Sequence, residues 1–297
     1  MQPKTCIVIC GPTAIGKTTV AIDLAAHFNT SIISADSRQC YRELNIGVAR
    51  PGLEELQKLP HFFIASHSIH QNITAAQFEL YALEKLNHIF EKQQVAVMVG
   101  GTGLYIKAFC QGLDAVPAIP QKIREALQQE YAEKGFAWLT ATLQEKDPLY
   151  ASEGEMKNPQ RMLRALEVMV HTGVSIKQLQ KGISEKRDFN MVQVCLQMPR
   201  EILYQRINER VDAMMAAGLL DEVKNLYPSR HLNALQTVGY TELFDYIEGK
   251  TSLADAVQLI KQHTRNYAKR QETWFKKQPG MLFSNPDLKS VLSVIKI

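Results

Sequence analysis

The sequence has 297 residues, of which 45% are hydrophobic and 22% charged, a composition typical of a globular protein of one or two domains. Such a composition excludes disorder as the main state, and the net charge of +4 permits a nucleic-acid partner without requiring one. The five cysteines are odd in number and widely spaced, which argues against a disulfide framework and against structural zinc, and indicates a reducing cytoplasm. The sequence has neither a signal-peptide layout nor a run of 18 apolar residues, so we expect no association with a membrane.

The N-terminal part alternates between strand and helix patterns. Short apolar runs predict buried strands at 6–10, 31–34 and 95–99, and helical periodicity covers 18–28 and 75–92. This alternation predicts an α/β fold with a parallel sheet, right-handed crossovers and helices on both faces.

The pattern changes after Gly112. No strand is expected between 114 and 186, where the predicted helices are 121–134, 136–146 and 158–171. A strand pattern returns at 191–197, and most of 201–277 is helical. We therefore expect three segments, namely the first part of the core at 1–113, an all-helical insertion domain at 114–190, and a return strand with C-terminal helices at 191–297.

Basic residues are concentrated in two segments, 157–187 and 261–277, each with an excess of five positive charges. Such segments are often no more than solvated faces. Two of them in one chain nevertheless make a polyanionic partner a hypothesis to test.

A phosphate-binding motif follows the first predicted strand and precedes the first predicted helix. It fits G-x-x-x-x-G-K-[ST] without a mismatch, as Gly11, Pro12, Thr13, Ala14, Ile15, Gly16, Lys17 and Thr18. Glycines let backbone N–H groups converge on phosphate oxygens, and the helix N-terminus adds partial positive charge. Lys17 supplies a point charge, and the Thr18 hydroxyl is suited to binding Mg²⁺. The motif predicts a diphosphate or triphosphate ligand.

The acid that P-loop nucleotidases carry at the end of an apolar strand is missing, because the strand at 95–99 runs into Gly100-Gly101-Thr102-Gly103. The acid nearest a strand end is Asp36, and parallel strands open their ligand sites at their carboxyl edge. Asp36 is therefore expected at the phosphate pocket, as a helix cap, a Mg²⁺ ligand or a general base. The glycine-rich turn at 100–103 indicates either a close backbone approach or a simple tight turn.

Six motifs together resemble the bacterial tRNA dimethylallyltransferase family, also called tRNA isopentenyltransferases. In chain order they are 11–18, Asp36-Ser-Arg-Gln-Cys-Tyr41, Ile46-Gly-Val-Ala-Arg-Pro51, Gly100-Gly-Thr-Gly-Leu-Tyr105, Pro159-Gln-Arg-Met-Leu-Arg-Ala-Leu-Glu-Val168, and Thr264-Arg-Asn-Tyr-Ala-Lys-Arg-Gln-Glu-Thr-Trp-Phe275. The resemblance therefore spans nearly the whole chain.

The resemblance implies group transfer rather than nucleotide hydrolysis. The donor would be dimethylallyl diphosphate, held by the P-loop with Mg²⁺, and the acceptor the exocyclic amine of the adenosine immediately 3′ of the tRNA anticodon. It further implies that Asp36 is the general base, that Thr102 lies near the reacting centre, and that Arg210 reaches the diphosphate. Catalysis would then stabilise the charge that grows on the leaving diphosphate.

The resemblance also implies two groups of tRNA-binding residues. The first group would meet the target base and consists of Asp36, Ser37, Arg38, Gln39 and Thr102. The second lies in the helical insertion and consists of Gln160, Arg161, Met162, Leu163 and Arg164. Gln160 and Arg164 share a helix face, while the apolar residues of the same helix suit packing. The partners expected are thus the anticodon stem-loop of tRNA and dimethylallyl diphosphate, with the protein as a monomer.

The chain departs from the usual family pattern at Ile15, Val48 and Arg50, and in the stretch 155–158. None of these departures removes a role named above. Three other functions remain as alternatives, namely an adenylate isopentenyltransferase acting on free AMP, ADP or ATP, a P-loop small-molecule kinase, and a non-catalytic RNA-binding module. The helical insertion with its basic helix argues against the first, the absent strand-end acid against the second, and the intact P-loop with Asp36 against the third.

Overall fold

The computed structural model describes residues 4–180, 182 and 185–296. The chain forms two compact units. The first combines Met1–Cys110 with Lys186–Ile297, and the second is Gln111–Glu185. The division thus falls a few residues before each predicted boundary of the insertion, 114 and 190.

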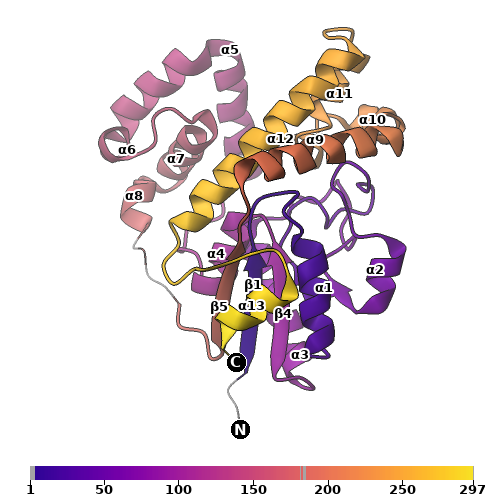
Figure 1. The fold of residues 1–297 in the computed structure, drawn as a ribbon. Helices are drawn as coiled ribbons and strands as arrows, with labels where there is room; N and C mark the ends of the chain where they lie inside the picture. Colours follow the sequence, from indigo (N-terminus) through magenta and orange to yellow (C-terminus); the bar gives the residue numbers. More distant parts are fainter. Residues whose placement is uncertain (1–3, 181, 183–184, 297) are drawn as a thin grey trace. The chain divides into compact units, whose positions relative to one another are not determined.

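A six-stranded sheet forms the centre of the first unit, with strand order β3-β2-β4-β1-β5-β6. All neighbouring strands are parallel, which confirms the predicted α/β class. The strands are β1 (Thr5–Cys10), β2 (Ile32–Ser34), β3 (His61–Phe62), β4 (Val95–Gly100), β5 (Asn190–Leu196) and β6 (Leu282–Ser284). Since β4 lies between β1 and β2, the loops after these three strands meet at one carboxyl edge (Figure 1).

The first unit contains nine of the described α-helices and two short 3₁₀ turns. Before the second unit these are α1 (Lys17–His27), α2 (Leu53–Lys58), α3 (Ala75–Phe90) and α4 (Gly103–Gln111). After it come α9 (Arg200–Ala216), α10 (Leu219–Leu226), η1 (Tyr227–Ser229), η2 (Asn233–Leu235), α11 (Thr241–Ile247), α12 (Leu253–Lys276) and α13 (Leu288–Ile295). None of the described helices is both long and apolar enough to cross a membrane.

Hydrophobic packing on both faces explains why β1 reads as an unbroken apolar run. Cys6, Val8 and Cys10 belong to a core cluster shared with α3, α4 and α11. Ile7 and Ile9 point to the opposite face, where they pack with residues of α1 and α13. The alternation follows from the two-residue repeat of a strand, and a strand covered on both faces needs apolar residues at every position.

The second unit has its own hydrophobic core, and its described residues include no strand. Its helices are α5 (Gln121–Lys146), α6 (Pro148–Glu153), α7 (Pro159–Thr172) and α8 (Ile176–Leu179). Gly135, with φ 75° and ψ −168°, interrupts α5 at the point where the sequence predicts two helices. Helix α7 begins as predicted, because Asn158 accepts hydrogen bonds from the amides of Gln160 and Arg161 and Pro159 occupies the first turn.

Candidate functional site

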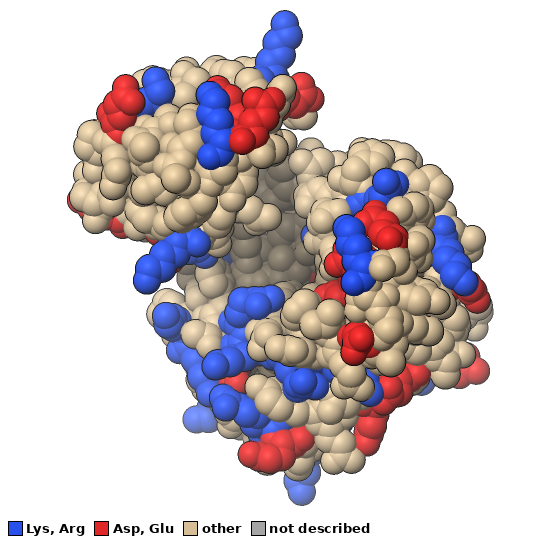
Figure 2. All heavy atoms as spheres, turned by 90° about the horizontal axis from the view of Figure 1, so that it is seen from above, with Lys and Arg blue, Asp and Glu red and all other residues tan. Residues whose placement is uncertain are grey.

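Basic side chains gather on the side of the molecule toward which the carboxyl ends of the strands point. Figure 2 views this side, and Lys and Arg crowd the lower left of the view with few acids among them. Helices α9 and α12 of the first unit carry exposed basic residues, among them Arg200, Arg206, Lys269 and Arg270.

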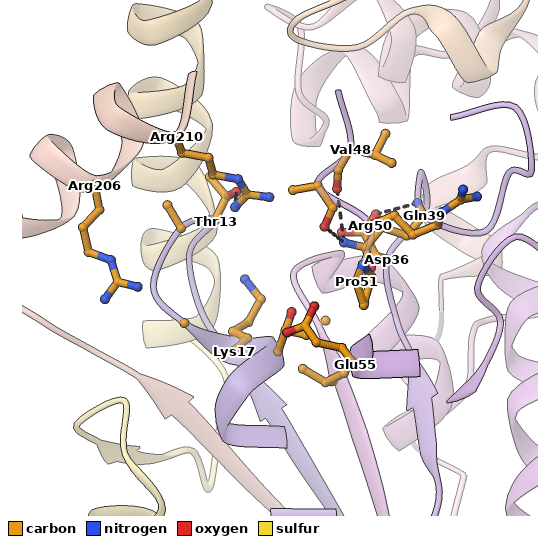
Figure 3. A pocket seen from close by; sticks show the side chains of 16 residues that line it. Thr13, Lys17, Asp36, Gln39, Val48, Arg50, Pro51, Glu55, Arg206 and Arg210 are labelled. Atoms are coloured by element: carbon orange, nitrogen blue, oxygen red, sulfur yellow. Dashed lines mark hydrogen bonds between the residues drawn. The ribbon is translucent and has the colours of Figure 1, made fainter. Parts of the chain in front are cut away.

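A cavity of about 330 Å³ lies at the carboxyl edge of the sheet in the first unit (Figure 3). Five segments line it: the P-loop after β1, the turn after β2, the loop 48–51 with Glu55 of α2, the end of β4, and two arginines of α9. The lining residues are Thr13, Ala14, Gly16, Lys17, Thr18, Asp36, Gln39, Val48, Ala49, Arg50, Pro51, Glu55, Val99, Gly100, Arg206 and Arg210. The structure thus brings most of the P-loop together with Asp36, Gln39 and Arg210.

The backbone of the P-loop takes the conformation that its glycines permit. Gly11 and Gly16 have φ values of 140° and 103°, in the region that side chains disfavour. Helix α1 begins at Lys17 without a side-chain cap, so its first amides are free to bind an anion. The side chain of Ile15 is fully buried in the core cluster that contains α1, which explains how the chain tolerates an apolar residue there.

Lys17 bends back over the P-loop, and its Nζ donates a hydrogen bond to the carbonyl of Pro12 at 2.8 Å. Burial lowers the pKa of Lys17 to about 8, an effect that the nearby Asp36 carboxylate opposes and Arg210 reinforces. A bound diphosphate would favour the charged amine. Lys17 is therefore positioned to exchange a backbone carbonyl for a phosphate oxygen.

Two arginines of α9 supply further positive charge to the cavity. Arg210 is largely buried, donates from Nη1 to Thr13 Oγ1 at 3.3 Å, and has its pKa lowered by burial. Arg206 lies one helical turn earlier and also points into the cavity (Figure 3). Arg206 was not predicted as a site residue from the sequence, although its i, i+4 spacing from Arg210 places both on one helix face.

The Asp36 carboxylate lies across the cavity from these cations. Its Oδ1 accepts hydrogen bonds from the amides of Arg38 at 2.9 Å and Gln39 at 3.2 Å, and residues 37–40 form a turn rather than a helix. Among the described residues, no hydrogen-bond donor contacts Oδ2. One oxygen thus holds the turn while the other remains available to a ligand, a metal ion or a proton.

Thr102 connects the turn after β4 to the turn after β2. Its Oγ1 accepts a hydrogen bond from the amide of Ser37 at 3.0 Å and donates one to Ser37 Oγ at 3.3 Å. The family resemblance implies that Asp36 and Thr102 both act at the reacting centre. They lie on two turns that direct hydrogen bonds join.

The glycines of the 100–103 turn allow close packing, which settles the question that the sequence left open. A Cβ atom on Gly100 would overlap the backbone of Ala35, one on Gly101 would overlap Gln271, and one on Gly103 would overlap Trp274. The last two residues belong to α12. The turn is glycine-rich because Ala35, directly after β2, and two residues of α12 approach its backbone.

The loop at 45–51 forms another wall of the cavity, and a carboxylate of α10 holds it. Glu222 accepts hydrogen bonds from the amides of Asn45, Ile46 and Gly47 at 2.8–3.2 Å, and from the Tyr240 hydroxyl at 2.6 Å. Gln39 Nε2 donates to the carbonyls of residues 48 and 49. Sequence patterns gave no sign of the Glu222 contact with this loop, because three of its four partners are backbone amides about 175 positions away.

The predicted tRNA-binding residues of the insertion lie on α7 of the second unit. Gln160 and Arg161 are exposed, whereas Met162 is fully buried and so is not open to an RNA contact in this structure. Leu163 is half-buried. Arg164 donates from Nη1 to the buried Glu167 carboxylate at 3.3 Å, which gives it a structural partner.

An all-parallel sheet with a P-loop at its carboxyl edge, and with cations facing a carboxylate across one cavity, defines a P-loop protein that binds a phosphate-bearing small molecule. The family model described as IPP transferase matches residues 39–278, so the chain belongs to that family. A tRNA dimethylallyltransferase of Christiangramia forsetii is 47% identical to this chain, over 91% of this chain and 90% of the relative. One from Cytophaga hutchinsonii is 43% identical, over 95% and 93%.

Solved structures give the same result. The tRNA isopentenylpyrophosphate transferase of Bacillus halodurans is 34% identical with a TM-score of 0.70, over 96% of this chain and 90% of that one. A eukaryotic dimethylallyltransferase acting on tRNA is 26% identical with a TM-score of 0.79, over 98% of this chain and 76% of that one.

Proposed function

We propose that this protein is a tRNA dimethylallyltransferase. It transfers the dimethylallyl group of dimethylallyl diphosphate to the exocyclic amine of the adenosine immediately 3′ of the anticodon, and releases diphosphate. The observation that carries the proposal is the cavity of the first unit, which has three cationic side chains on its P-loop side and the Asp36 carboxylate opposite them. The near-full-length relatives that bear this activity in their names support it.

The donor diphosphate is held by the P-loop amides and Lys17. As the allylic C–O bond breaks, negative charge grows on the leaving diphosphate, and Lys17, Arg206 and Arg210 are placed to stabilise it. An arginine suits this purpose, because its planar fork of donors matches a phosphate. The charge that develops in the transition state is thus met by groups already in position, which lowers the barrier.

Mg²⁺ fits this site, because Thr18, Asp36 and Glu55 place oxygen donors on the lining of the cavity. Mg²⁺ in phosphate sites is commonly held by one or two protein oxygens together with the phosphates, so the absence of a larger acidic cluster among the described residues agrees with this role. The ion would neutralise part of the diphosphate charge. We propose Thr18 as its protein ligand.

Asp36 acts on the acceptor. An adenine amine is a weak nucleophile, so removing its proton during attack helps, and Asp36 Oδ2 is the oxygen available for this step. The target base must leave its stack to reach the cavity, as in other base-modifying enzymes. Ser37, Arg38, Gln39 and Thr102 would surround it there, and Gln160, Arg161, Leu163 and Arg164 would contact the RNA elsewhere.

The alternatives fit less well. An adenylate isopentenyltransferase would have no use for the helical unit with its exposed Gln160 and Arg161. A P-loop kinase would have an acid after the central strand, where β4 ends in Gly100 and continues with Gly101. A non-catalytic RNA-binding module would have no use for the cation-lined cavity. We further propose that the enzyme acts in the cytoplasm as a monomer.

Acceptor choice tests the proposed function. The protein is incubated with dimethylallyl diphosphate labelled in its allyl group and with unmodified tRNA, AMP, ADP or ATP in turn. We expect label in tRNA only. Label in a free nucleotide supports the adenylate enzyme, transfer of the γ-phosphate of ATP supports a kinase, and tRNA binding without transfer supports the RNA-binding module.

A further inference from the structure

One buried side chain of α12 joins the two glycine-rich turns of the cavity. Gln271 is only 6% exposed. Its Oε1 accepts a hydrogen bond from the Thr13 amide of the P-loop at 2.8 Å, and its Nε2 donates one to the Gly101 carbonyl at 2.9 Å. The P-loop and the turn after β4 are therefore linked by one carboxamide.

The chemistry of the two contacts explains why a glutamine occupies this position. The Thr13 amide needs an acceptor and the Gly101 carbonyl needs a donor, and a buried backbone group without a partner costs about 1–3 kcal/mol. A carboxamide offers both at once in the neutral state. Gly101 has no Cβ, so the amide approaches its backbone directly.

Each of the two residues that Gln271 contacts lies next to a group with a proposed role in the transfer. Thr13 accepts a hydrogen bond from Arg210, on the side of the leaving diphosphate. Gly101 precedes Thr102, which binds Ser37 next to Asp36 on the side of the acceptor. The two contacts of Gln271 therefore fix the donor half of the cavity relative to the acceptor half.

We propose that Gln271 is a positioning residue for the transfer step, which sets the P-loop and the Asp36–Thr102 turns at the separation that the reaction needs. The inference rests on the proposed function. Displacing reacting groups by about 1 Å can cost on the order of 10²-fold in rate, so loss of this link lowers the rate of transfer between bound substrates more than the binding of either one.

Two substitutions separate the contacts. In Gln271→Glu the carboxylate still accepts a hydrogen bond from the Thr13 amide, but it has no donor for the Gly101 carbonyl. Only the link to the turn after β4, on the Asp36–Thr102 side of the cavity, is therefore lost. In Gln271→Met the volume is nearly kept and both contacts are lost. Gln258→Glu is the matched control, because Gln258 is an exposed residue of the same helix outside the basic segment.

The test begins by establishing that the unsubstituted protein labels tRNA, since failure at that point refutes the proposed function and not the role of Gln271. Single-turnover transfer is then measured at saturating dimethylallyl diphosphate and tRNA, together with the dissociation constant of each substrate and the melting temperature. Rates are expressed per mole of folded protein, and they are measured at a temperature below the unfolding transition of each variant.

We expect both Gln271 variants to transfer about 10- to 100-fold more slowly at saturation, with dissociation constants within about threefold of the unsubstituted protein. Gln258→Glu should behave as the unsubstituted protein. A normal saturating rate per folded protein in both Gln271 variants would overturn the proposal, as would an equal loss in the control. A loss confined to substrate affinity would make Gln271 a binding residue instead.

Discussion

Replacing Asp36 with asparagine should stop proton removal without disturbing the turn that Asp36 holds. The amide oxygen of asparagine can accept from the amides of Arg38 and Gln39 as Oδ1 does now, so the two hydrogen bonds of 2.9 and 3.2 Å survive. The other oxygen becomes an NH₂ group, which accepts no proton. General-base catalysis typically contributes about 10²–10⁴-fold, and the turnover should fall by that factor.

Asp36→Ala is the comparison that separates the two roles of the carboxylate. It removes both hydrogen bonds and should cost about 1–2 kcal/mol of stability in addition to the loss of turnover. Turnover is measured with labelled dimethylallyl diphosphate, and stability by urea unfolding. Turnover of Asp36→Asn near that of the unsubstituted protein would refute the general-base role, and restoration by excess Mg²⁺ would favour a metal-ligand role.

Three further predictions concern charge and loop position. The pKa of Lys17 is about 8 in the free protein, so below pH 8 diphosphate binds a protein whose Lys17 amine is already protonated. Above pH 8, the Lys17 amine should take up a proton when diphosphate binds. Calorimetry in buffers of different ionisation enthalpy should detect this uptake, and a proton count equal to that of Lys17→Met would refute it. Arg161→Ala should lower the slope of log tRNA affinity against log salt by about 0.7–0.9 and leave the melting temperature unchanged. Arg164→Ala should also lower the melting temperature, because it leaves the buried Glu167 with one partner fewer. An unchanged salt slope for Arg161→Ala would count against an RNA contact. Glu222→Gln should loosen the loop at 45–51 and raise its rate of amide hydrogen exchange, with the neighbouring exposed Asp221→Asn as the control. Equal exchange in the two variants would contradict the anchoring role.

Local sequence patterns predicted most of the fold of the first unit. The strand at 95–99 and the helix at 18–28 match β4 and α1 to within one residue at each end. Patterns failed for two of the three shortest strands, since only β2 was predicted among them. Strands β3 and β6 have two and three residues, too few to display a repeat, and their pairing with β2 and β5 depends on sequence-distant neighbours.

The residues of the candidate site likewise fall into those that local sequence predicts and those that it does not. A local motif located the P-loop, and the position of a carboxylate after a strand placed Asp36 at the cavity. The roles of Gln271 and Glu222 could not be predicted from the sequence, because each side chain forms hydrogen bonds with backbone groups of loops about 170 or more positions away. Any loop sequence offers such backbone groups. The resemblance supplied Arg210, but its neighbour Arg206 needed the helix geometry of α9.

The proposed transfer to tRNA is tested most directly by mass spectrometry of tRNA nucleosides from a strain that lacks the gene for this protein. We predict that the dimethylallyl-modified adenosine 3′ of the anticodon, with any product formed from it, disappears from this strain. The unsubstituted protein should restore the modification, and Asp36→Asn, present at equal abundance, should leave it almost absent. Unchanged modification in the deletion strain would refute the proposed function.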